Sequence, residues 1–101
     1  MEMLGNAFRE SLIEQIHALL NDYDVAAYSE LHNVTGKGAT GLTSQFFLAP
    51  ATNRMILTAV SDQLAYRLIE VFARFRLEQE AAQGDNIVPL HVFVLACEQA
   101  V

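Results

Sequence analysis

The chain of 101 residues is 52% hydrophobic and 18% charged, which supplies apolar material for the core of one domain and argues against disorder. Six basic and twelve acidic residues give a formal net charge of −6. A nucleic-acid surface needs clustered cations that neutralise phosphates, so this composition argues against nucleic acid as a partner. No apolar run approaches the roughly 20 residues that span a bilayer.

The single cysteine and the N-terminus indicate a compartment. Cys97 has no second cysteine with which to form an internal disulfide or a cysteine zinc cluster. The first residues, MEMLGNAFRE, carry an acid and lack a basic n-region, so we do not expect a signal peptide. These features favour a cytoplasmic protein.

The first third of the chain predicts a strand, a helix and a second strand. Residues 3–8 form a short apolar run typical of a strand. Ser11-Leu12-Ile13-Glu14 matches a capping box, in which the serine and the glutamate satisfy free amides of the first helical turn. Apolar residues then recur at helical spacing to about residue 21: Leu12, Ile13, Ile16, Leu19 and Leu20. A second strand is expected over residues 25–34.

The second half predicts a strand, a long helix and a final strand. The sequence NRMILTAV at residues 53–60 is a strand, and Ser61 or Asp62 caps a helix that runs to about residue 83. The predicted buried stripe of this helix comprises Leu64, Leu68, Ile69, Phe72 and Phe75. Gly84-Asp85-Asn86 ends the helix, and the last strand is expected from Ile87 to about Cys97.

This order predicts an α+β fold over residues 1–101, the ferredoxin-like βαββαβ arrangement. Its four-stranded antiparallel sheet would carry two helices on one face. In the last strand both alternating sets are apolar apart from His91: Val88, Leu90, Val92 and Val94 against His91, Phe93, Leu95 and Cys97. Leaving such side chains in water forfeits about 1.5–3 kcal/mol each. We therefore expect the uncovered face to meet another subunit, the alternative being that loops or C-terminal residues cover it.

The connection over residues 35–52 is unusually long for a compact domain, and such loops commonly carry function. Its first part is rich in glycine and hydroxyl residues around one lysine: Gly36, Lys37, Gly38, Thr40 and Gly41. Glycines let backbone amides turn toward a phosphate, and lysine adds a point charge. Arg54 stands where the loop returns to the sheet. Two interpretations stay open, an anion-binding loop and a flexible loop with a solvated lysine.

Residue patterns for catalysis are missing from the sequence. No Gly-x-Ser-x-Gly motif occurs, and the carboxylates form no evident acid/base pair. His17, His32 and His91 do not fall at paired metal-ligand spacings, and His17 is predicted to be a surface histidine. We therefore expect a protein that is not an enzyme.

Three short patches carry a family resemblance. They are the stretch from Gly36 to Gly41 after the second strand, the junction Val60-Ser61-Asp62, and Gly84-Asp85-Asn86 followed by the strand that ends Phe93-Val94-Leu95-Ala96-Cys97-Glu98. The first resembles the base of the T-loop of the nitrogen regulatory PII proteins and their PII-like relatives, and the second resembles their strand-to-helix junction. The third is similar to their Gly-Asp-Gly-Lys loop and Phe-Val-Leu-Pro-Val-Glu strand. Asn86 and Ile87, however, stand where that family has glycine and a phosphate-binding lysine.

The resemblance implies a homotrimer that binds a small anionic effector, ATP, ADP or another anion, in clefts between subunits. It implies signal transduction to a membrane transporter or an enzyme through the 35–52 loop. The implied ligand-binding residues are Gly36, Lys37, Gly38, Thr40, Gly41, Arg54, Gly84 and Asp85. The apolar patch Phe46-Phe47-Leu48 would contact the partner.

The alternative is a trimer similar to the CutA group, which shares this fold. It would respond to divalent metal ions, with His32 and His91 near the subunit boundaries.

Overall fold

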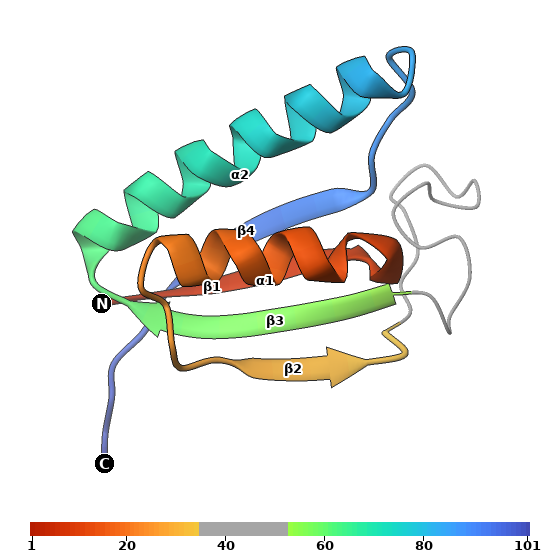
Figure 1. The fold of residues 1–101 in the computed structure, drawn as a ribbon. Helices are drawn as coiled ribbons and strands as arrows, with labels where there is room; N and C mark the ends of the chain where they lie inside the picture. The colour runs from red at the N-terminus through yellow and green to blue at the C-terminus, as the bar shows by residue number, and fades with distance from the viewer. Residues whose placement is uncertain (35–52) are drawn as a thin grey trace.

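The computed structural model describes residues 1–34 and 53–101. The elements are β1 (Glu2–Arg9), a 3-10 turn (Glu10–Leu12), α1 (Ile13–Asp22), β2 (Ser29–His32), β3 (Asn53–Val60), α2 (Asp62–Ala82) and β4 (Leu90–Ala96). Both helices lie on the same side of the sheet (Figure 1). The predicted α+β ferredoxin-like fold is therefore confirmed. Neither of the two described helices is long and apolar enough to cross a membrane.

The sheet has the strand order β2-β3-β1-β4, and every neighbouring pair is antiparallel. Three register pairs, Arg9 with Asn53, Phe8 with Leu90 and His32 with Arg54, bring four strand ends together. The ends of β1 and β2 and the starts of β3 and β4 thus share one end of the sheet (Figure 1). Segment 35–52 joins the sheet at this end, because it connects β2 to β3.

The core lies between the sheet and the two helices. Its fully buried members come from every layer: Leu4, Phe8, Ile16, Leu20, Ile56, Leu68, Phe72 and Leu90. In the predicted stripe of α2, Leu68, Phe72 and Phe75 are buried, while Leu64 and Ile69 are partly buried against the core. The predicted cap is confirmed at Ser61, whose hydroxyl accepts a hydrogen bond of 3.2 Å from the Leu64 amide.

The capping box predicted at Ser11 is wrong. Ser11 lies inside the 3-10 turn, and the helix that follows takes Leu12 as its N-cap without a side-chain hydrogen bond. The turn follows β1 directly, and Arg9 donates its amide to the Pro89 carbonyl at 3.3 Å. The extended residue that precedes the helical turns is Arg9, so Ser11 lies inside the turn and does not occupy the cap position.

Two predicted strands are shorter than expected. Residues 25–28 precede β2 rather than belong to it, because Asp24 takes a left-handed conformation with φ 60° and Val25 donates to the Leu20 carbonyl at 2.8 Å. Val25 is instead part of the core. The last strand begins at Leu90 rather than Ile87, because Pro89 has no amide to give to a sheet and the Val88 amide bonds the Glu80 carboxylate at 3.1 Å.

The face of the sheet opposite the helices is apolar and uncovered by any described element. Strand parity and register place on it Met3, Ala7, Leu31, Met55, Leu57, Ala59, Phe93 and Leu95. Phe93 is 52% exposed and Leu95 is 62% exposed. The expectation of strands that are apolar on both faces is met at β4.

His91 lies on this same face, stacked on Phe93 with ring centroids 6.4 Å apart. Burial is the main cause that lowers the pKa of His91 from its ordinary value of 6.5, and the positive charge of Arg76 lowers it further. The neutral imidazole is therefore favoured in the folded chain.

We expect replacement of the buried Leu68 by alanine to lower the free energy of unfolding by about 2–5 kcal/mol, because it removes apolar contacts and leaves a cavity. Leu77 provides a matched control on the same helix, since it is 64% exposed. Leu77→Ala should cost less than about 0.5 kcal/mol. Chemical denaturation measures both, and equal losses would contradict this core.

We expect His91 to make stability depend on pH. Its lowered pKa means that the unfolded chain binds a proton more readily than the folded chain below the ordinary value of 6.5. The contribution of His91 is thus present above that pH and is lost as the pH falls through the folded pKa. His91→Gln should lose less stability than the wild type between about pH 7.5 and about pH 5. An unchanged pH dependence in that variant would refute the assignment.

Candidate functional site

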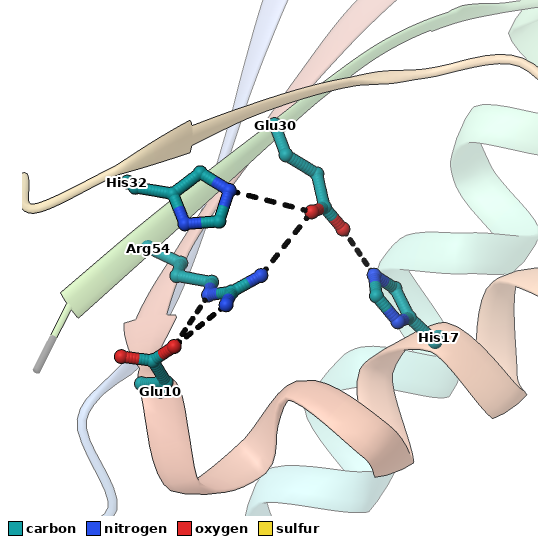
Figure 2. A network of polar contacts seen from close by, with 5 residues as sticks. All are labelled: Glu10, His17, Glu30, His32 and Arg54. Atoms are coloured by element: carbon teal, nitrogen blue, oxygen red, sulfur yellow. Dashed lines mark hydrogen bonds and ion pairs between the residues drawn. The ribbon is translucent and has the colours of Figure 1, made fainter.

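Five polar side chains gather at the end of the sheet where segment 35–52 joins it. Glu10 follows β1, His17 comes from α1, Glu30 and His32 come from β2, and Arg54 comes from β3 (Figure 2). Residues 30, 32 and 54 project from the helix side of the sheet, since their register partners alternate with the outer face. The cluster therefore fills the space between α1 and the β2 edge.

Arg54 is the centre of this cluster. Its Nε and Nη2 donate to Oε1 of Glu10 at 3.0 and 2.6 Å, and its Nη1 donates to Oε2 of Glu30 at 3.3 Å. The Arg54 side chain is only 18% exposed. Charge-assisted hydrogen bonds of this kind are stronger than neutral ones. The guanidinium thus ties the start of β3 to the residue after β1 and to β2.

Glu30 connects this ion pair to two histidines. Its Oε1 contacts Nε2 of His17, and its Oε2 lies 4.0 Å from Nε2 of His32. The imidazole of His17 also stacks on Tyr28, with centroids 5.8 Å apart. His17, predicted to be a simple surface histidine, is therefore half-buried and anchored to β2. The contact joins residues 13 positions apart on different elements, so no local sequence spacing signals it.

This arrangement binds the ends of β1, β2 and β3 to one another. Among the residues described on either side of segment 35–52, no group of three or more histidine, cysteine or acidic side chains could hold a metal ion. Arg54 was predicted to bind an anion, and the structure shows its charge engaged by two carboxylates. An anion that reaches this guanidinium must compete with Glu10 and Glu30.

The turn that carries the predicted ligand-binding residues Gly84 and Asp85 lies after α2, at the same end of the molecule (Figure 1). Gly84 and Asp85 both have positive φ, 69° and 64°. Their amides donate to helix carbonyls, Gly84 to Ala81 at 3.3 Å and Asp85 to Glu80 at 2.7 Å. The turn therefore satisfies the C-terminus of α2, and these two amides are not turned outward toward a phosphate.

Most of the other predicted site residues belong to segment 35–52, and the two candidate metal-binding histidines lie on the sheet. Gly36, Lys37, Gly38, Thr40, Gly41 and the patch Phe46-Phe47-Leu48 lie outside the described residues. His32 and His91 lie on β2 and β4, the two edge strands of the sheet. Three strand spacings, roughly 14 Å, separate those edges. One chain therefore does not bring His32 and His91 onto a common ion.

Solved structures of CPII, a nitrogen regulatory PII-like protein from Thiomonas intermedia K12, are similar to this chain. The structure bound to ADP, AMP and bicarbonate is 28% identical with a TM-score of 0.66, covering 92% of this chain and 86% of CPII. The structure bound to ADP and bicarbonate is 26% identical with a TM-score of 0.67, covering 93% and 82%. The apo form is 26% identical with a TM-score of 0.67, covering 93% and 85%.

No protein-family model and no curated protein matches the chain. The CPII structures nevertheless combine about a quarter of identical residues with the same fold over nearly the whole chain. The resemblance to the PII-like proteins, predicted from three short patches and the order of elements, is therefore confirmed.

Proposed function

We propose that this chain is a PII-like signal-transduction protein of the cytoplasm. It forms a homotrimer, binds an adenine nucleotide or a related small anion in clefts between subunits, and regulates a transporter or an enzyme through segment 35–52. The observation that carries the proposal is the similarity to CPII, whose structures hold ADP, AMP and bicarbonate. The protein acts by binding and not by catalysis.

The uncovered sheet face supports the assembly. Exposed apolar side chains there, such as Phe93 and Leu95, have no described element over them. Monomeric proteins rarely leave a contiguous apolar patch of a whole sheet face in water. Burial of this face between three copies removes the patch and creates seams between subunits.

The distribution of cations supports a site at the loop end. Of the six basic residues, Arg54 is paired with carboxylates, Arg67 lies over the Tyr23 ring at 5.7 Å, and Arg76 bonds the Leu90 carbonyl. Arg74 is exposed on α2. Arg9 closes β1 at the end where segment 35–52 joins the sheet, and Lys37 belongs to that segment, so these two cations are the candidates for an effector at that end.

No observation on the described residues favours the CutA-like alternative, since His32 and His91 occupy opposite edges of the sheet. Binding of divalent metal would require a site shared between subunits.

We expect the wild type to show a light-scattering mass three times the 11.2 kDa of one chain. Leu95→Glu should lower that mass, because it places a charge on the apolar sheet face that the assembly would bury. Leu77→Glu is the matched control, since Leu77 is equally exposed but lies on α2. A wild-type mass of one chain at micromolar concentration would refute the assembly.

We expect calorimetry to detect binding of at least one of ADP, AMP, ATP, cyclic AMP and bicarbonate. Lys37→Ala should weaken that binding about tenfold or more, because a charge-assisted hydrogen bond contributes about 1.5–3 kcal/mol. Arg74→Ala, which removes an exposed cation from α2, should bind as the wild type does. Absence of binding by every ligand, or equal binding by Lys37→Ala, would contradict the proposed effector site.

A further inference from the structure

A groove lies between α2 and β4, on the side of the molecule away from the polar cluster. Ile69, Phe72, Ala73 and Arg76 line it from α2, and Leu90 and Val92 line it from β4. The helix residues follow the spacing i, i+3, i+4, i+7 of a single helix face, and the strand residues alternate onto the helix side. The groove is therefore built from two rigid elements.

The floor of this α2–β4 groove is apolar. Phe72 and Leu90 are buried, while Val92 and Ile69 are partly buried beside them. The groove has a volume of about 180 Å³. An engineered apolar cavity of roughly 150 Å³ binds benzene, so this groove accepts a body of one ring or a short branched chain.

Arg76 gives the groove a polar end. Its Nη1 donates to the Leu90 carbonyl at 3.2 Å, which holds the guanidinium against β4. Its Nε is buried and has no hydrogen-bond acceptor within residues 1–34 and 53–101. Because Nε has almost no accessible surface, an acceptor from outside the chain must reach the other nitrogens of the guanidinium. Arg76 as a residue is only partly buried, and a guanidinium carries five N–H donors.

The guanidinium of Arg76 indicates which kind of hydrogen-bond acceptor the groove would bind. A guanidinium presents its N–H groups in a planar fork that matches a carboxylate, and charge-assisted pairs of this kind are the strong ones. No ion pair within residues 1–34 and 53–101 engages Arg76. The positive charge at the groove is therefore complementary to an anion from outside the chain.

We propose that the α2–β4 groove binds a small carboxylate with an apolar body of about one ring. The ring lies against Ile69, Ala73 and Val92, which are at least partly exposed, and the carboxylate accepts from the guanidinium of Arg76. The residues that line the groove include neither Gly84 nor Asp85, and the proposal does not depend on the proposed nucleotide site.

Benzoate is the probe for this site, and nuclear magnetic resonance titration of the full chain is the measurement. Saturable shifts should appear at residues of α2 and β4. Benzyl alcohol, which lacks the charge, and acetate, which lacks the ring, should each bind about tenfold more weakly or worse. The pKa of His91 should rise on saturation with benzoate, because the bound carboxylate offsets the charge of Arg76 that lowers it.

Three variants complete the test. Arg76→Gln should weaken benzoate binding about tenfold or more, and Ala73→Leu should abolish it by filling the groove. Arg74→Gln is the matched control, an exposed arginine on the same helix, and should bind as the wild type does. ADP binding should be the same in Ala73→Leu as in the wild type, which separates this site from the nucleotide site.

Wild-type protein that shows no saturable benzoate binding would overturn the proposal. Benzoate binding that is as strong in both Arg76→Gln and Ala73→Leu as in the wild type would also overturn it. A light-scattering mass that falls in Arg76→Gln, with no benzoate binding to the wild type, would assign the groove to a second copy of the chain instead.

Discussion

The structure depends on the fact that two helices can cover only one face of a four-stranded sheet. α1 and α2 lie on the same side of the sheet (Figure 1). The buried helix-facing strand residues are Leu4, Asn6 and Phe8 of β1, Ile56, Thr58 and Val60 of β3, and Leu90 of β4. The opposite face carries side chains such as Met55, Leu57 and Phe93, which are as apolar as the core. Hydrophobic burial scales with the area removed from water, so the second face retains a large unused driving force. That driving force is the physical basis for an assembly of several copies.

The polar cluster around Arg54 has a complementary role at one end of the sheet. Segment 35–52 leaves the fold at β2 and returns at β3, and the guanidinium links those two strands to Glu10 beyond β1. A half-buried ion pair loses stability strongly when one partner is displaced, because the other charge is left uncompensated. An anion that competes for Arg54 would therefore alter the attachment of both ends of the segment. This coupling gives the proposed effector a physical route to the segment.

Much of the fold was predictable because the spacing of apolar residues within a single segment indicates whether that segment forms a helix or a strand. The buried stripe of α2 and its Ser61 cap follow from residues within one helix, and β3 follows from the short, mostly apolar run at residues 55–60. The errors occur where contacts with a neighbouring element determine the local conformation. Ser11 does not cap α1, because β1 continues directly into a 3-10 turn, and Val25 joins the core instead of a strand.

The candidate site was harder to predict than the fold. Arg54 was recognised as a cation at the loop end, but its partners Glu10 and Glu30 lie 44 and 24 residues away in sequence. The Glu10 contact depends on the register of β1 against β3, and the Glu30 contact depends on the register of β2 against β3. A slip of one residue would turn these side chains to the other face. His17 and Glu30 likewise meet only after α1 docks on the sheet. Pairs of this kind require tertiary geometry, which the spacing of residue types does not encode.

The charge balance decides which kind of anion site this protein can have. A chain with a net charge of −6 does not attract anions over long distances, and salt screens exposed charges beyond about 8 Å at physiological ionic strength. Binding must then come from donors that are held in place close to the ligand. Arg76 meets this condition, because the Leu90 carbonyl fixes one nitrogen and no carboxylate among the described residues pairs with its guanidinium. Arg54 meets it only when an anion displaces Glu10 and Glu30 from its guanidinium. The two arginines therefore favour different kinds of site. Arg76 favours direct binding of an anion in the α2–β4 groove, and Arg54 favours binding that breaks the contacts between the strands joined by segment 35–52.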